Sequence, residues 1–248
     1  MLAKPLTDKV ALVTGGSRSI GAAIAKRLAA DGAAVAITYS ASPEKAKAVV
    51  AAIEGAGGRA IAIAADAGDP EAVRAAVAKT VEAFGGIDIL VNNAGIALGG
   101  PIEEIKFADY ERMIAVNVTG IFVATQEAVR HMKPGGRVIQ IGSSMARYAA
   151  FPTASLYTMT KGAIAGFNRS LARDLGPRGI TVNIVDPGST DTDMNPAAGP
   201  RADAQRAKMA IPRYGTPEDI AGLVAYLASE EARFVTGAGF AIDGGVNT

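Results

Sequence analysis

Residues 10–21 read VALVTGGSRSIG, and this stretch decides the fold. The apolar run Val10 to Val13 predicts a short buried strand, and a helical pattern continues from the glycines to Ala30. Glycines between a first strand and a first helix let backbone N–H groups approach a pyrophosphate, and the helix N-terminus adds a favourable dipole. A lone glycine-rich turn is weak evidence, but this one stands in the required context. The turn therefore predicts dinucleotide binding by Gly15, Ser17, Arg18, Ser19 and Ile20.

Strands and helices alternate outward from this turn along the whole chain. We expect strands at 10–13, 34–38, 59–64, 87–91, 138–141, 180–185 and 240–242. We expect helices up to residue 30 and at 43–54, 69–84, 105–131, 154–175 and 217–229. Alternation of this kind favours a parallel sheet covered on both faces. Without a linker or repeat, the chain is predicted to be one α/β domain over residues 1–248, a Rossmann-type doubly wound sheet. The irregular segment at about 189–212 is long enough to be a substrate lid.

Composition excludes several functional classes. The 248 residues carry a net charge of +1 without a basic block, so nucleic acid is not an expected partner. The absence of cysteine rules out disulfides and a thiol nucleophile, and one histidine, His131, cannot build a metal cluster or a Ser-His-Asp triad. The first nine residues show no signal region, and no apolar run approaches about 20 residues. We expect a cytoplasmic protein with no metal and no membrane partner.

The end of the second predicted strand bears on the choice of cofactor. A carboxylate there would hold the ribose hydroxyls of NAD and repel a 2′-phosphate. Residues 38–42 read TYSAS, and no acid follows before Glu44. Arg18 is placed to meet a phosphate and Lys45 adds charge, so we favour NADP(H) over NAD(H); the alternative is that Arg18 is only solvated. The cofactor residues predicted here are Tyr39, Ser40 and Ser42.

Further candidates follow the other strands, because ligands of open parallel sheets bind beyond the carboxyl ends of the strands. Asp66 is placed to accept from the adenine amino group, or else it caps a turn. Thr190 and Thr192 are placed to meet the nicotinamide carboxamide, or else they are simple turn hydroxyls. The cofactor residues predicted at these ends are Asp66, Ala67, Asn93, Ala94, Gly95, Pro187, Gly188, Thr190 and Thr192.

The segment SLYTMTK at 155–161 places Tyr157 and Lys161 four residues apart in a predicted helix. Residues i and i+4 share one helix face, and a nearby ammonium favours the ionised form of a phenol. Such a pair can act as an acid/base catalyst. The spacing arises often by chance, so alone it also fits an ordinary exposed helix face.

Together these motifs resemble the classical short-chain dehydrogenase/reductases, from Thr14 to Gly245. The similarity is closest to bacterial 3-oxoacyl-[acyl-carrier-protein] reductases and related carbonyl reductases. The family's Thr-Gly-x-x-x-Gly-x-Gly motif matches residues 14–21, except that Ser19 replaces the second motif glycine. A side chain there narrows the approach of the cofactor, or else it caps the helix or binds a phosphate. The catalytic residues that the resemblance implies are Asn117, Ser144, Tyr157 and Lys161.

The resemblance also implies roles for these four residues. Tyr157 gives a proton to the carbonyl oxygen, Lys161 supports it and holds the nicotinamide ribose, and Ser144 stabilises the developing charge. Asn117, a poor helix former, bends its helix and holds a water that links Lys161 to solvent. Only one of two adjacent serines fits the spacing, so Ser143 is expected to be structural.

The expected reaction is the NADP(H)-dependent reduction of a ketone, a 3-oxoacyl thioester or a related carbonyl compound, to a secondary alcohol. An alcohol, sugar or cyclic-ketone dehydrogenase is the alternative, and a non-catalytic NADP-sensing binder is a distant third. The substrate is expected to be moderately apolar without a fixed counter-ion. Arg130 and Arg173 are candidate docking residues for a carrier protein, or else they pair locally, and the two long helices suggest a homotetramer by analogy. The predicted substrate residues are Ser144, Ala146, Phe151, Tyr157 and Met194.

Overall fold

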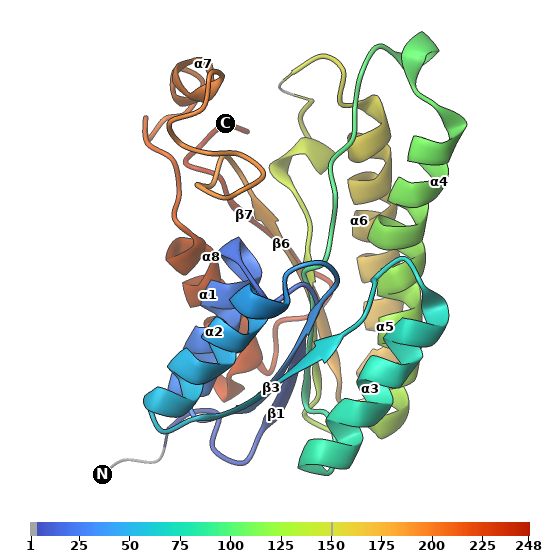
Figure 1. Cartoon of the computed structure of the whole chain (residues 1–248), viewed down its shortest axis with the longest axis vertical. Helices are drawn as coiled ribbons and strands as arrows, with labels where there is room; N and C mark the ends of the chain where they lie inside the picture. Colours follow the sequence, from blue (N-terminus) through green and yellow to red (C-terminus); the bar gives the residue numbers. More distant parts are fainter. Residues whose placement is uncertain (1–3, 150) are drawn as a thin grey trace.

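The computed structural model describes residues 4–149 and 151–248, and its centre is one seven-stranded sheet (Figure 1). Every pair of neighbouring strands is parallel, in the order β3-β2-β1-β4-β5-β6-β7. This arrangement confirms the predicted Rossmann-type α/β fold. The expectation of no signal region falls partly on residues 1–3, which lie outside the described residues. The strands are β1 (Val10–Val13), β2 (Ala34–Tyr39), β3 (Arg59–Ala64), β4 (Ile89–Asn92), β5 (Arg137–Ile141), β6 (Thr181–Pro187) and β7 (Gly239–Ile242).

Helices cover both faces of the sheet, as predicted (Figure 1). One face packs against α1 (Ser19–Ala30), α2 (Pro43–Gly55) and α8 (Pro217–Ala228). The other face packs against α3 (Pro70–Phe84), α5 (Gly120–His131) and α6 (Ser155–Leu175), and α4 (Phe107–Ile114) lies beside α6. The central strands β1, β2 and β4 are mainly apolar because both of their faces are buried.

Local signals set the ends of several helices. The Asp69 carboxylate accepts from the backbone N–H of Glu71 (2.9 Å) and caps α3, which ends at Gly85 in the left-handed conformation, with φ +84°. At α8, Thr216 and Asp219 form a capping box, in which each side chain accepts from the backbone N–H of the other. These caps set where the two helices begin and where α3 ends.

The helix expected at 105–131 is not continuous. It consists of α4, a π-helical segment η2 (Ala115–Thr119) and α5, and the widened turn contains the buried Asn117. The irregular segment after β6 also contains the short helix α7 (Ala202–Arg206), which sequence periodicity did not predict. Other one-turn helices are η1 (Ile102–Glu104), η3 (Ser144–Ala146), η4 (Gly176–Arg178) and η5 (Glu230–Ala232).

The side on which successive strands are added to the sheet changes between β1 and β4. Strands β2 and β3 extend the sheet on one side of β1, whereas β4 and all later strands lie on the other. The connections therefore diverge above the carboxyl ends of β1 and β4 and leave a crevice there. Within residues 4–149 and 151–248, no helix is long and apolar enough to cross a lipid bilayer.

Candidate active site

A cleft of about 830 Å³ lies over the carboxyl edge of the sheet. Its lining comes from the segments that follow β1 to β6, from the start of α6 and from the segment 189–205. Every residue predicted to bind the cofactor lines this cleft, from Gly15 to Thr192. So do Ser144, Phe151, Tyr157 and Met194. Among the described residues, Asn117 and Ala146 are the two predicted site residues that do not line it.

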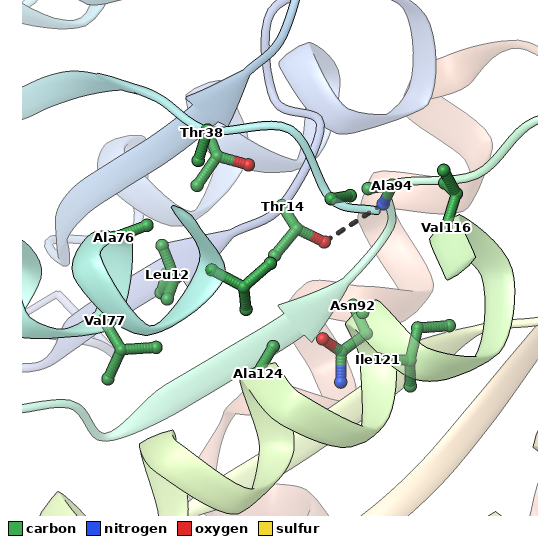
Figure 2. A pocket seen from close by; sticks show the side chains of 14 residues that line it. Leu12, Thr14, Thr38, Ala76, Val77, Asn92, Ala94, Val116, Ile121 and Ala124 are labelled. Atoms are coloured by element: carbon green, nitrogen blue, oxygen red, sulfur yellow. Dashed lines mark hydrogen bonds between the residues drawn. The ribbon is translucent and has the colours of Figure 1, made fainter. Parts of the chain in front are cut away.

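The glycine turn is fastened to its neighbouring strands by hydrogen bonds. The hydroxyl of Thr14 accepts from the backbone N–H groups of Asn93 and Ala94, both at 3.0 Å, and Figure 2 shows the second contact. The Asn93 amide donates to the carbonyl oxygens of Thr14 (2.9 Å) and Gly15 (3.0 Å). Gly15 has φ +65°, and a Cβ there would lie 2.9 Å from Cα of Ala94. Only glycine fits this close approach.

The small cavity drawn in Figure 2 lies behind this turn and is a packing feature. Its free volume is about 10 Å³, and its lining is apolar except for groups such as Thr14 and Asn92. That volume is close to the minimum that holds one water molecule. The large cleft is therefore the candidate ligand site.

Helix α1 begins at this turn with its backbone donors uncapped. Arg18 is the N-cap residue, and its side chain makes no capping hydrogen bond. The first N–H groups of a helix have no partner within the helix, and Ser19 and Ile20 line the cleft. Uncapped donors at a helix N-terminus are the arrangement that binds a pyrophosphate.

Ser19 does not cap α1. Its backbone is in the left-handed region, with φ +48°, where the absence of a Cβ favours glycine. Its hydroxyl accepts instead from the backbone N–H of Asp193 at 3.3 Å. The departure from the glycine motif thus places a side chain between the turn and the segment 189–212.

The two cations expected near a 2′-phosphate share one partner. Arg18 Nη1 and Lys45 Nζ both donate to Oδ2 of Asp193, at 3.2 and 2.9 Å. The hydrogen bond from Lys45, together with that from Arg18, lowers the pKa of the Asp193 carboxyl. Arg18 is therefore not only solvated, and the segment 189–212 reaches across the cleft to it.

Asp66 lies in the cleft beyond β3 and is held by two donors. Its Oδ1 accepts from the backbone N–H of Gly68 and from Nη2 of Arg112, both at 2.9 Å. The hydrogen bond from Arg112 is the main cause of the lowered pKa of Asp66. The expected turn contact is present, and within the described chain Oδ2 has no hydrogen-bond partner, which leaves it available to an adenine amino group.

Tyr157 and Lys161 lie one turn apart on α6. The Lys161 ammonium is 5.7 Å from the centroid of the Tyr157 ring. It donates to the carbonyl oxygen of Ile141 at the end of β5 (2.9 Å), and the residue is only 4% exposed. Tyr157, half-buried, and the nearly buried Ser144 line the same cleft. A phenol, an ammonium and a hydroxyl therefore line the same cleft as the glycine turn.

Asn117 is fully buried and contacts segments next to this group. Its Nδ2 donates to the carbonyl oxygen of Ile96 (2.9 Å) and to Oγ1 of Thr160 (3.1 Å), and its Oδ1 accepts from the N–H of Ile96 (2.9 Å). These contacts connect η2 to the segment after β4 and to α6. The water that the resemblance places at Asn117 stays a prediction.

The loop that carries Ser144 rests on a buried carboxylate. Ser143 donates its backbone N–H to Oδ1 of Asp186 (3.1 Å), and its hydroxyl accepts from the N–H of Met145 (3.2 Å). Asp186, the penultimate residue of β6, is only 2% exposed, and burial raises the pKa of its carboxyl. The guanidinium of Arg147, at 3.6 Å, acts in the opposite direction. Ser143 thus has a structural place beside Ser144.

The segment 189–212 forms one side of the cleft. Gln205 exchanges hydrogen bonds with Asn195 (3.0 and 3.1 Å) and accepts from Ser189, which folds the segment onto itself. Met209 of the same segment is buried and does not line the cleft. Arg201 lines the cleft, is exposed, and has no acidic partner among the described residues. The expected moderately apolar substrate without a fixed counter-ion stays a prediction.

Three charged residues of the cleft were not assigned from the sequence: Arg112, Asp193 and Arg201. The sequence around Arg112 did not predict its place in the cleft, because its partner Asp66 lies 46 positions away. Asp193 and Arg201 fall in the predicted lid, so the segment was recognised but not its charges. The described residues contain no group of acids and histidines able to hold a metal ion.

A doubly wound sheet with a tyrosine–lysine pair beside a nucleotide-type glycine turn defines a class of Rossmann-type oxidoreductases. The sequence model of the family described as "Enoyl-(Acyl carrier protein) reductase" matches residues 15–247. The chain belongs to the short-chain dehydrogenase/reductase family, as the resemblance predicted, and is an oxidoreductase of that family.

Solved structures agree with this assignment over almost the whole chain. A short-chain dehydrogenase from Burkholderia cenocepacia J2315 in complex with NADP is 58% identical, with a TM-score of 0.97, and the match covers 98% of this chain and 100% of that one. A blue fluorescent protein from a metagenomic library in complex with NADPH is 52% identical, with the same TM-score and coverage.

Curated relatives carry different activities on the same scaffold. The cyclic-di-GMP-binding biofilm dispersal mediator protein of Escherichia coli is 45% identical over 96% of this chain and 97% of its own length. Versicolorin reductase 1 of Aspergillus parasiticus is 42% identical, over 97% of both chains. The 3-oxoacyl-[acyl-carrier-protein] reductase of Synechocystis is 39% identical, over 97% of this chain and 98% of its own.

Proposed function

We propose that this chain is an NADP(H)-dependent reductase that converts a ketone, a 3-oxoacyl thioester or a related carbonyl compound, to a secondary alcohol. One observation carries the proposal: Tyr157, Lys161 and Ser144 meet in the cleft that the glycine turn opens. A proton donor for a carbonyl oxygen therefore lies beside a site built for a nucleotide.

The residues of the cleft fit a dinucleotide. The uncapped donors of α1 suit the pyrophosphate, and Arg18 and Lys45 supply positive charge for a 2′-phosphate. β2 ends without an acid, so nothing at that strand repels the phosphate. Relatives of this fold were solved with NADP and NADPH, which supports the same preference here over NAD(H).

The remaining parts of the cofactor have candidate partners at the other strand ends. Asp66 and Ala67 would border the adenine, and Asn93, Ala94 and Gly95 would form the floor beneath the ribose. Pro187, Gly188, Thr190 and Thr192 would border the nicotinamide carboxamide. When bound, the reduced cofactor supplies the hydride.

Tyr157 donates the proton in the proposed reaction. Its hydroxyl gives a proton to the carbonyl oxygen as negative charge develops there, and the hydroxyl of Ser144 donates a second hydrogen bond to the same oxygen. The Lys161 ammonium, oriented by the carbonyl of Ile141, stabilises the phenolate that remains. Asn117 holds the backbone of Ile96 and Thr160 of α6, so it positions the group without touching substrate.

The charge of the segment 189–212 supports an acyl thioester as the substrate. Arg201 brings an exposed cation to the cleft, and the Lys208 ammonium lies 4.3 Å from the centroid of the Phe151 ring at its wall. The phosphate of a pantetheine arm carries the complementary charge. The 3-oxoacyl-[acyl-carrier-protein] reductase relative supports the same substrate class.

Two alternatives have a specific relative behind them. The versicolorin reductase relative shows a reductase with a different substrate on the same scaffold, in keeping with the alternative of a cyclic-ketone dehydrogenase. The Escherichia coli relative, described as cyclic-di-GMP-binding, favours a binder, but here all four catalytic residues are intact.

As partners we propose a small carbonyl substrate and further copies of this chain in a homotetramer in the cytoplasm. Carrier-protein docking at Arg130 is weakened, because its guanidinium already bonds Glu127 (2.9 Å).

A turnover assay separates these functions. NADPH oxidation is followed with an acetoacetyl thioester, with its neutral ester analogue and with simple cyclic ketones. The proposal expects the thioester to have the highest kcat/KM. Preference for the cyclic ketones would favour the versicolorin reductase type of activity, and NADPH binding without turnover of any substrate would favour the binder.

A further inference from the structure

One residue of the segment 189–212 fastens that segment across the cofactor cleft. The Oδ2 atom of Asp193 accepts from Arg18 of the glycine turn (3.2 Å) and from Lys45 in the first turn of α2 (2.9 Å). The Asp193 backbone N–H donates to the hydroxyl of Ser19 (3.3 Å). We call these three contacts the Asp193 clasp. Its partners lie 148 to 175 positions away in the chain, so the clasp joins the segment 189–212 to the glycine turn and to α2.

The clasp uses the two cations that the proposed function assigns to a 2′-phosphate. A phosphate monoester carries about 1.5 to 2 negative charges near neutral pH and binds best to unoccupied cationic donors. Asp193 stays ionised there, because its hydrogen bonds from Lys45 and Arg18 lower its pKa. A 2′-phosphate must therefore displace this carboxylate or share both cations with it.

NADH makes no such demand. Its adenosine ribose ends in an uncharged 2′-hydroxyl, and a carboxylate beside that hydroxyl accepts a hydrogen bond from it. In this chain β2 ends without an acid, and the carboxylate arrives instead from a segment that follows β6. The Asp193 clasp can thus stay closed around NADH, whereas NADPH has to open it.

We propose that Asp193 is a specificity-determining residue that opposes NADPH and admits NADH, by holding Arg18 and Lys45 from the lid side. The inference rests on the cofactor site proposed above. Arg18, Lys45 and Asp193 are each about half exposed, so water screens the clasp and its effect on affinity is moderate.

The test measures dissociation constants of NADPH and NADH for the wild-type chain and for Asp193→Asn, by quenching of protein fluorescence or by calorimetry. We expect the variant to bind NADPH roughly threefold to tenfold more tightly, with little change for NADH. Asp191→Asn is the matched control. It removes the same charge two residues away, where the Asp191 carboxylate accepts only from the N–H of Ala197 among the described residues.

A double variant tests whether the effect of Asp193 depends on Arg18 and Lys45. In the double variant Arg18→Gln/Lys45→Gln, adding Asp193→Asn should no longer change the ratio of the two affinities. Weaker binding of both cofactors by Asp193→Asn would overturn the inference, because the clasp would then only close the lid. An equal gain in the double variant would overturn it as well. If the wild-type chain bound neither cofactor, the proposed function itself would fail.

Discussion

At the scale of single residues, the chemistry of the cleft depends on where a few side chains find their partners. Lys161 reaches the carbonyl of Ile141 and lies 5.7 Å from the Tyr157 ring centre, so the i, i+4 spacing translates into one shared site. Asp193 finds Arg18 and Lys45 across the cleft. The first relation is local in sequence, and the second is not.

Ser19 allows a direct test of backbone strain. Its φ of +48° costs an L-residue about 1 kcal/mol, and glycine removes this cost. We expect Ser19→Gly to raise the free energy of unfolding by about 0.5–1 kcal/mol in chemical denaturation. Ser17→Gly is the matched control, because Ser17 has no positive φ and should only lose stability. A loss of stability in Ser19→Gly as well would contradict the strain argument.

The sequence shows that Ser19 replaces a motif glycine, but it does not show the result. Whether a serine adopts left-handed backbone depends on the turn around it, here fixed by Thr14 and Asn93. Its contact with Asp193 depends on a segment 174 positions later. The residue could therefore be singled out from the sequence, whereas its conformation and partner required the structure.

At the scale of elements, periodicity predicted the strands and most helices because each buries an apolar face. The helix expected at 105–131 shows where this signal ends. Asn117 satisfies its amide with Ile96 and Thr160, and the chain widens to a π-helix to bring it there. The sequence pattern showed that Asn117 is a poor helix former. It did not predict the π-helical segment, because the contacts that favour this segment are tertiary.

The junction of β6 with the loop after β5 carries a prediction on pH. Burial raises the folded-state pKa of Asp186, so the stability it contributes is present below its unfolded pKa and lost as the pH rises through the folded value. Asp186→Asn keeps an acceptor for the N–H of Ser143 and removes the buried charge. We expect its melting temperature to exceed that of the wild type by a few degrees at pH 7, with the gap closing as the pH falls toward about 4.

Asp219→Asn provides a control of opposite sign. The backbone N–H of Thr216 lowers the pKa of Asp219, so its contribution is present above the unfolded pKa and lost in acid. That variant should be less stable than the wild type at pH 7 and should approach it below about pH 4. If Asp186→Asn were less stable than the wild type at pH 7 and approached it in acid, the charge of Asp186 would be of net benefit to the fold, and the argument from burial would be contradicted.

At the scale of the whole molecule, alternation of strands and helices indicated a doubly wound sheet, and the order β3-β2-β1-β4-β5-β6-β7 agrees with it. The carboxyl edge therefore gathers the residues that are predicted to bind the cofactor. The charge balance of the cleft was beyond the sequence, because Asp66, Arg112, Asp193 and Arg201 come from segments far apart in the chain. Only the folded chain shows which of these charges are paired.

The surface of α4 to α6 carries a prediction on assembly. Phe107 is 70% exposed, and Phe122 and Met159 are each 48% exposed, beyond the usual burial of such side chains. We propose that this face pairs subunits. Light scattering should give a mass about four times 25.1 kDa. Phe122→Glu should reduce that mass, whereas Ala51→Glu on the exposed face of α2 should leave it unchanged. A monomeric wild-type chain would contradict the proposal.

The most direct test of the account compares Tyr157→Phe with the wild type, using NADPH and an acetoacetyl thioester. The variant keeps the ring beside Lys161 but has no proton to donate. The account predicts unchanged NADPH affinity and a kcat that is lower by roughly 10² to 10⁴. Turnover equal to that of the wild type would contradict the assignment of Tyr157 as proton donor, and with it the proposed reaction.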